Sequence, residues 1–232
     1  MIRNDPERHL LAIEMSQRGG AVAFGREAGA LLVERFESGG GQDADPLVPT
    51  IDRVVRAAGC APKDIGAIGI SIGPGGFTGL RISVTVAKCL SESLGVPVVA
   101  VPSALVAAAA AEGQGDWIVA LASKRETAWI SRVRGDDGRL VIEGQPGVVH
   151  ASDFRTDPHD RTLLADEFAP ADMIARARDA GLTIERPQFD AIPCWKLAKA
   201  LLQRGTTVNP LELAPLYPRE PEAVTLWRER HG

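Results

Sequence analysis

Residues 73–81 read Gly-Pro-Gly-Gly-Phe-Thr-Gly-Leu-Arg and place four glycines within seven positions. Glycine loses more backbone entropy on folding than any other residue, so the run indicates a turn with close backbone approach rather than the interior of a helix or strand. It follows an apolar segment, residues 64–72, that predicts a buried strand, and it precedes a helical pattern from Gly79 to Leu94. Such a junction lets backbone N–H groups approach a phosphate or another backbone segment.

The composition is that of an ordinary globular protein. The chain has 232 residues, of which 45% are hydrophobic, 24% charged and only 5% aromatic, a balance that suits helices packed on buried strands. The net charge is −4 and Lys and Arg form no cluster, so we expect no direct, tight binding of nucleic acid. Three well-separated cysteines favour a reduced, cytoplasmic protein. We expect no signal peptide and no membrane span.

The order of the predicted elements indicates an α/β fold with two domains. Three opening strands are followed by alternating helices and strands, which gives a mixed sheet with helices on it. In this first domain, residues 1–112, we predict strands at 10–13, 21–25, 30–37, 64–72 and 96–101, a loop at 38–45, and helices at 46–58, 79–94 and 103–112. In the second, residues 113–232, we predict strands at 116–121, 127–133 and 139–143, a turn at 135–138, a loop at 144–162, helices at 170–180 and 192–204, and an extended proline-rich arm at 209–232. The hydroxyl groups of Thr78 and Ser103 are predicted to cap the helices that follow them.

The helix at 79–94 has two apolar stripes. The first, expected to face the sheet, consists of Leu80, Val84, Ala87, Leu90 and Leu94, and the second of Ile82, Val86 and Cys89. The helix at 46–58 repeats this pattern more weakly, with Val48 and Val55 off its main stripe. A helix that is apolar on two sides is covered on both, either by another part of its own chain or by a partner. The sequence does not distinguish between cover by the chain itself and cover by a partner.

No constellation of residues predicts catalysis or a metal site. The glycine run lacks the lysine of a Walker A loop and the later acidic residue of a dinucleotide fingerprint. The four histidines show no ligand spacing, and no nucleophile elbow occurs. Glu14 ends the first strand, where sugar and acetate kinases hold a Mg²⁺-binding aspartate, but it has no evident partner. Arg81 suits either an anion or an ion pair with a nearby acid.

Three segments together resemble the TsaB family, also called YeaZ. Residues 10–16, Leu-Leu-Ala-Ile-Glu-Met-Ser, resemble its opening strand, and residues 47–51, Leu-Val-Pro-Thr-Ile, resemble its Leu-Leu-Pro helix start. The run from Gly73 to Ile82 resembles its signature, commonly Gly-Pro-Gly-Ser-Phe-Thr-Gly-Leu-Arg-Ile-Gly. The resemblance is strong from residue 10 to about 105, vague across 116–190, and faint again at residues 215–219.

The resemblance implies an actin-like fold of two lobes, of the sugar-kinase and heat-shock-protein type. It also implies a non-catalytic subunit that pairs with the catalytic paralogue TsaD in adding threonylcarbamoyl to N6 of adenosine 37, in tRNAs that read codons beginning with A. A TsaE-like ATPase in the larger complex, a homodimer when the chain is alone, and ATP or ADP at the joint surface with TsaD are further implications. Family members pair through the helices that correspond to 46–58 and 79–94, so Val48, Val55, Ile82, Val86 and Cys89 are the expected interface residues.

Departures from the family pattern limit what the loop is expected to do. Glu14 and Met15 stand where relatives have Asp-Thr, and Gly76 stands where they usually have Ser. The loop residues Gly73, Pro74, Gly75, Gly76, Phe77, Thr78, Gly79 and Arg81 are therefore expected to form at most a vestigial phosphate site. One alternative is a phosphotransferase or ATPase that uses this loop and Glu14. A peptidase is a remote alternative, because no nucleophile or metal constellation supports it.

Overall fold

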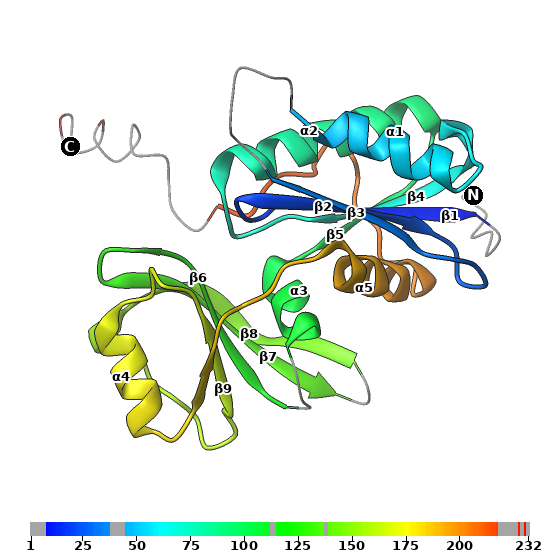
Figure 1. The fold of residues 1–232 in the computed structure, drawn as a ribbon. Helices are drawn as coiled ribbons and strands as arrows, with labels where there is room; N and C mark the ends of the chain where they lie inside the picture. Colours follow the sequence, from blue (N-terminus) through cyan, green and yellow to red (C-terminus); the bar gives the residue numbers. More distant parts are fainter. Residues whose placement is uncertain are drawn as a thin grey trace.

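The computed structural model describes residues 8–37, 45–111, 115–136 and 139–217, together with positions 227 and 230. The described residues form two lobes, each built on a five-stranded mixed sheet flanked by helices (Figure 1). The predicted α/β architecture with two lobes is thereby confirmed. In the first sheet the order β3-β2-β1-β4-β5 comprises β1 (His9–Glu14), β2 (Gly19–Gly25), β3 (Leu32–Glu37), β4 (Ile65–Ser71) and β5 (Val98–Val101). In the second, the order β10-β9-β6-β7-β8 comprises β6 (Trp117–Lys124), β7 (Thr127–Asp136), β8 (Arg139–His150), β9 (Thr162–Ala165) and β10 (Thr183–Glu185).

The two sheets share one topology, although the sequence shows no internal repeat. In each, the first three strands pair antiparallel and the fourth and fifth are added parallel, on the other side of the first strand. Parallel neighbours require a crossover, and helices supply it in both lobes. The second lobe is thus a topological copy of the first.

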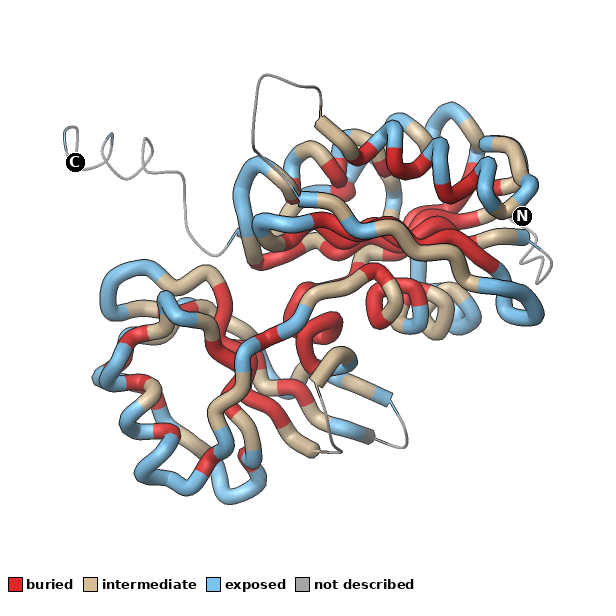
Figure 2. The backbone as a smooth tube through the Cα atoms, in the orientation of Figure 1, coloured by how far each residue is buried: buried red, intermediate tan, exposed pale blue. Residues whose placement is uncertain are grey.

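Helices cover both faces of the first sheet, which explains why β1 reads as an unbroken apolar run. Leu11 and Ile13 face α1 (Leu47–Ala57) and α2 (Phe77–Leu94) in one core cluster. Leu10 and Ala12 face the opposite way, toward α3 (Ser103–Ala110) and α5 (Ala191–Gln203). Successive strand side chains alternate between faces, so a strand covered on both sides is apolar at every position. Figure 2 shows the resulting buried layer between the helices.

The helix α5 belongs to the first lobe by its contacts, although the predicted division at residue 112 assigned it to the second. The indole Nε1 of Trp195 donates to the backbone oxygen of Leu10 over 3.0 Å. Ala198 lies so close to β4 that a Cβ built on Gly69 would be 2.4 Å from the Ala198 Cβ. The chain therefore returns to the first sheet after completing the second. Sequence order alone does not reveal this return, because the packing partner is far away along the chain.

The second lobe contains strands that the sequence reasoning did not predict. The predicted loop at 144–162 is wrong over residues 144–150, where β8 continues, and short strands occur at β9 and β10. Gly144, Pro146 and Gly147 are residue types common in loops, but β8 is an edge strand and tolerates a residue without a backbone N–H. The helix α4 (Ala171–Asp179) packs on the face of this sheet away from the first lobe. Short 3-10 turns lie at Pro62–Asp64 and Ala151–Asp153.

Both predicted hydroxyl caps are wrong. The helix α2 begins at Phe77, two residues before the predicted start, with Gly76 as its N-cap and no side-chain cap. Ser103 is the first residue of α3, and its hydroxyl group is 2.7 Å from that of Ser71 instead. The cap that does form was missed: the Asp190 carboxylate accepts from the backbone N–H of Ile192 at the start of α5.

Part of the predicted C-terminal arm packs against the first lobe. Val208 pairs with Val98 at the edge of the sheet, and Leu213 is buried in the core beneath α2. The arm beyond residue 217 lies outside the described residues except at positions 227 and 230. Most of the predicted loop at 38–45 and part of the predicted turn at 135–138 also lie outside them. Among the described helices, none is long and apolar enough to cross a membrane.

Candidate functional site

The glycine loop is pressed against the turn that follows β1. The backbone N–H of Gly76 donates to the carbonyl oxygen of Ser16 over 2.7 Å. A Cβ placed on Gly75 would lie 2.0 Å from that same oxygen, closer than any side chain is tolerated. Gly73 has a φ of +103°, a backbone conformation that glycine adopts without strain. The loop is therefore a tight connection between β4 and α2, and at Gly76 its amide group is used by the protein's own backbone.

An exposed aromatic cluster, formed by Phe77, Arg81 and Tyr217, lies at the start of α2. The side chain of Phe77 is 55% exposed, and its ring centroid is 5.2 Å from that of Tyr217. The guanidinium carbon of Arg81 lies 4.9 Å from the Phe77 centroid, a cation–π contact. Among the described residues Arg81 makes no ion pair, and its alternative role in binding an anion stays a prediction.

The C-terminal segment brings Tyr217 to this place. The backbone N–H of Leu216 donates to the Ile72 oxygen over 2.7 Å, and the Lys88 ammonium group donates to the Leu211 oxygen over 3.1 Å. Residues 211–217 are thus fastened to the end of β4 and to α2. The sequence analysis did not identify Tyr217 as part of a site, because the only signal in this segment was the faint family resemblance at residues 215–219.

Four of the five residues predicted for a partner interface are accessible to different degrees. Val48 is 57% exposed on α1 and Cys89 is exposed on α2, while Ile82 and Val86 are half-buried against the core. The prediction for Val55 is wrong, because its side chain is only 2% exposed and packs beneath α1. The buried face of α1 is therefore wider than the apolar stripe that the sequence analysis assigned to it, and it includes Val55. The other four predicted residues lie on α1 and α2, the two helices that cover the same face of the sheet, as do Phe77 and Arg81 of the aromatic cluster.

A cavity of about 600 Å³ opens between the lobes. Its walls come from β1–β3 of the first lobe and from the segments 166–168 and 186–190, which follow β9 and β10. Glu14 lines this cavity, as do several carboxylates and arginines. It is separate from the exposed residues of α1 and α2 described above, which lie on the other side of the first sheet.

Glu14 is the one buried carboxylate of the first lobe among the described residues. It is 2% exposed, and its Oε1 accepts from the backbone N–H of Ser16 over 2.6 Å. Its Oε2 has no hydrogen-bond partner among the residues that the structure describes, although the hydroxyl groups of Ser16 and Ser71 lie near enough to favour ionisation. Burial raises the pKa of the Glu14 carboxyl above its ordinary value, and the negative charge of Asp190 adds to this. Within the described residues, no group of three or more His, Cys, Asp and Glu is placed to hold a metal ion.

Replacement of Glu14 by glutamine is expected to stabilise the protein at neutral and higher pH. A carboxyl whose pKa is raised in the folded state takes up protons on folding. The stability that Glu14 contributes therefore falls as the pH rises above the pKa that its carboxyl has in the unfolded chain. The Glu14→Gln variant lacks this loss. Urea denaturation of both proteins across the pH range measures the difference, which should grow in favour of the variant from acidic to neutral pH. A difference independent of pH would contradict the assignment.

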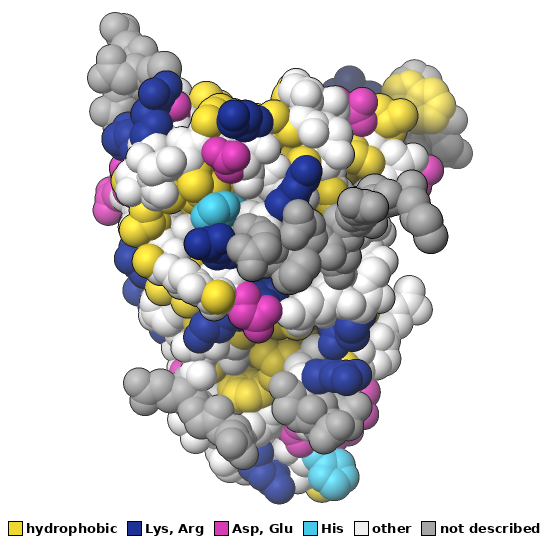
Figure 3. Space-filling view, turned by 90° about the vertical axis from the view of Figure 1, so that its right-hand side faces the viewer, with side chains coloured by type: hydrophobic (Ala, Val, Ile, Leu, Met, Phe, Trp, Pro, Cys, Tyr) yellow, Lys and Arg dark blue, Asp and Glu magenta, His cyan; other side chains and the backbone are white. Residues whose placement is uncertain are grey.

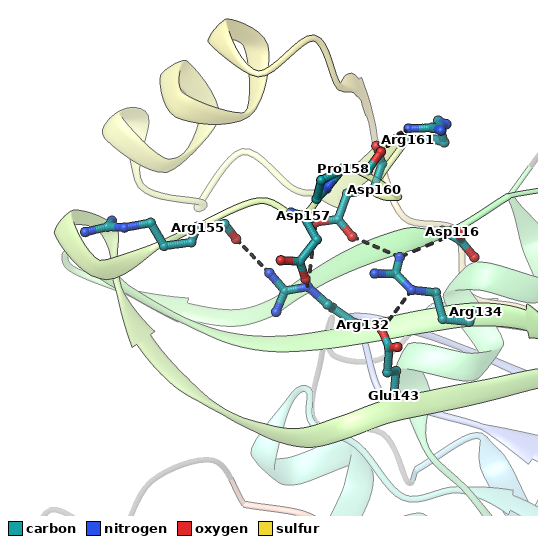
Figure 4. Close-up of polar contacts among 9 residues, drawn as sticks. All are labelled: Asp116, Arg132, Arg134, Glu143, Arg155, Asp157, Pro158, Asp160 and Arg161. Carbon is teal, nitrogen blue, oxygen red and sulfur yellow. Dashed lines mark hydrogen bonds and ion pairs between the residues drawn. The ribbon is translucent and has the colours of Figure 1, made fainter.

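A second group of charges lies in the other lobe and joins the segment after β8 to the sheet (Figure 4). Asp160 has a fully buried side chain, and its Oδ1 is 2.9 Å from Nη1 of Arg134. Arg132 pairs with Asp157 over 3.0 Å, and Arg134 also pairs with Glu143 over 2.9 Å. Because these charges neutralise one another, the network is suited to holding the segment in place. On the face drawn in Figure 3, basic and acidic side chains are interspersed.

Comparison with known proteins relates the glycine-loop region to tRNA modification. The family model described as TsaD, tRNA N6-adenosine threonylcarbamoyltransferase, matches residues 43–143. The TsaB protein of Bacillus subtilis, named for tRNA threonylcarbamoyladenosine biosynthesis, is 41% identical over 56 residues, 24% of each chain. An uncharacterized protein of Mycobacterium leprae is 28% identical over 88% of this chain. The chain thus spans about half of that relative, 52% of its length.

The fold has a close counterpart among solved structures. The structure of YeaZ from Pseudomonas aeruginosa superposes with a TM-score of 0.74. The two chains share 21% sequence identity over 90% of this chain and 99% of the other. The arrangement of two lobes around the cavity is therefore that of a known fold, and the predicted actin-like class agrees with it.

Proposed function

We propose that the chain is a member of the TsaB/YeaZ family and an accessory, non-catalytic subunit in the biosynthesis of threonylcarbamoyladenosine in tRNA. The name of the Bacillus subtilis relative and the family model support the pathway. The glycine-loop geometry supports the accessory role, since the amide of Gly76 bonds to Ser16 and the backbone of the loop is packed too tightly at Gly75 to cradle a phosphate there.

The proposed partner is a TsaD-like catalytic paralogue, which binds at the α2 surface. We define this surface as Val48, Ile82, Val86 and Cys89 together with the aromatic cluster. The observation that carries the proposal is the exposure of Phe77 and Val48 on the two helices over one face of the first sheet. Exposed aromatic and apolar side chains beside an arginine have the composition of interface centres. The described residues of the second lobe's sheet and of α4 do not cover them, because they pack from the opposite face.

Further parts of the proposal follow from the family. The complex modifies N6 of adenosine 37 in tRNAs that read codons beginning with A, and a TsaE-like ATPase joins it. ATP or ADP binds at the joint surface with the catalytic subunit. In the absence of that subunit, two copies of the chain pair through the same α2 surface, because an apolar surface of this kind is stabilised by being covered.

The proposal is tested by co-expressing the chain with the TsaD-like protein of the same organism, followed by size-exclusion chromatography. The two are expected to co-elute, and threonylcarbamoylation of tRNA by the pair should exceed that of the catalytic protein alone. The isolated chain should elute as a dimer. Separate elution of the two proteins, with no effect of the chain on the reaction, would overturn the proposed function.

A further inference from the structure

The cavity between the lobes has an excess of negative charge. It is lined by five carboxylates, Glu14, Glu37, Asp166, Glu167 and Asp190, and by three arginines, Arg18, Arg35 and Arg186. Two of the arginines are neutralised within the wall, since Arg35 pairs with Asp190 and Arg186 pairs with Glu167 over 3.0 Å. The three remaining carboxylates make no ion pair with any described residue. Arg18 is the one positive charge of the lining that is left to balance these carboxylates, so the net negative charge of the walls attracts a cation.

Glu14 is the part of this wall that is least satisfied. Its side chain is almost fully buried, yet its Oε2 has no hydrogen-bond partner among the described residues, and neither has the hydroxyl group of Ser16 beside it. A buried carboxylate oxygen without a hydrogen-bond partner is costly, and a positive group with N–H donors would satisfy it by charge and by hydrogen bonding. The unpaired oxygen at the cavity wall therefore suits a cationic hydrogen-bond donor.

Aromatic side chains complete the cavity. Phe36, Phe168 and Phe189 line it, and the guanidinium carbon of Arg18 lies 5.9 Å from the centre of the Phe168 ring. Arg18 belongs to the first lobe and Phe168 to the second, so a cation of the protein itself is already held against an aromatic face of this cavity. Carboxylates combined with aromatic faces are the surroundings that favour ammonium groups.

We propose that the cavity between the lobes is a binding site for a small organic cation whose ammonium group is bound by Glu14. The volume of about 600 Å³ is in the usual range for small-molecule sites. A nucleotide is disfavoured here, because its phosphates would meet the unpaired carboxylates. This site is independent of the α2 surface and of the proposed function, so either can fail without the other.

The test is isothermal titration calorimetry of the isolated chain with 1,4-diaminobutane and with butylamine at low ionic strength. The uncharged 1,4-butanediol is the control of matched length, and ADP tests the opposite charge. At least one cation should bind and the diol should not. Affinity for the cation should rise with pH, because a cation favours the ionised form of Glu14. The charged groups beside Glu14 are Asp190 and its partner Arg35, and the thiol of Cys194 stays neutral because burial raises its pKa.

Two substitutions distinguish this site from other modes of binding. Glu14→Gln removes the charge with little change in volume and should weaken cation binding at least about tenfold. Arg18→Ala removes the competing cation and should strengthen binding about threefold, whereas the same change would weaken the binding of an anion. Glu92→Gln, at an exposed position on α2, is the matched control and should change nothing. Circular dichroism verifies that each variant is folded.

Three results would overturn the proposal. These are the absence of heat with both cations, equal affinity of the wild type and Glu14→Gln, and binding of ADP that Arg18→Ala weakens. None of them bears on co-elution with the TsaD-like protein, so failure of this site leaves the proposed function intact.

Discussion

A Phe77→Asp substitution is expected to weaken binding to the TsaD-like partner at least about 100-fold, because it removes the exposed aromatic ring from the α2 surface and would bury a charged carboxylate in the contact. Phe77 is more than half exposed in the isolated chain, so the same change should have little effect on folding. Its contacts with Tyr217 and Arg81 are the main interactions that the free protein loses. Size-exclusion chromatography and calorimetry with the purified partner measure the change in affinity.

The matched control is Val148→Asp. Val148 is 42% exposed on the edge strand β8 of the other lobe, so it introduces the same charge at an exposed apolar position far from α2. This variant should bind the partner as the wild type does. Equal binding by Phe77→Asp and the wild type would place the interface elsewhere. Equal loss in both variants would show that any added charge impairs the complex.

A Gly75→Ala substitution is expected to lower the free energy of unfolding by about 3 kcal/mol, because the added methyl group meets backbone rather than a side chain that can move. The new Cβ would lie 2.0 Å from the Ser16 oxygen and 2.8 Å from its carbonyl carbon. Relief of this clash requires the loop and the turn after β1 to separate, which breaks the bond from Gly76. Urea denaturation of the two proteins measures the loss.

The neighbouring Gly76 gives the control, with an effect of opposite sign. A Cβ there would have its nearest contact at 3.7 Å, and the φ of −64° suits any residue. Gly76 is the N-cap of α2, a position that serine occupies with a hydrogen bond to the first turn. Gly76→Ser should therefore raise stability by about 0.5 kcal/mol. A similar loss in both variants would show that the loop tolerates no side chain and would contradict the contact at Gly75.

The first lobe was largely predictable, since its elements are punctuated by local signals. Five apolar runs became β1–β5, and Gly95 ends α2 in the left-handed conformation that favours glycine. The second lobe was less predictable, because β9 and β10 have only four and three residues. Strands this short have too few residues to show the alternation of apolar and polar side chains. They form because β9 pairs with β6 and β10 pairs with β9.

The candidate sites were also predictable only in part from the sequence. The exposure of Val48 and Cys89 could be predicted from their places off the main apolar stripes of their helices. The burial of Val55 could not, because the width of a buried stripe depends on what packs beneath it. The exposed aromatic cluster required Tyr217 to return from the far end of the chain. The cavity required Glu14 and Asp190 to come together from the two ends of the sequence.

By itself, the sequence determined the glycine-rich connection and the strand and helix on either side of it, because a turn depends on the backbone freedom of neighbouring residues. It also determined that α2 has more apolar surface than one sheet covers. The tertiary structure alone decided what the loop contacts, that α5 returns to the first sheet, and which charges face the cavity. These depend on contacts between residues far apart in the chain, and a periodic pattern shows which side of an element is apolar but not what covers it.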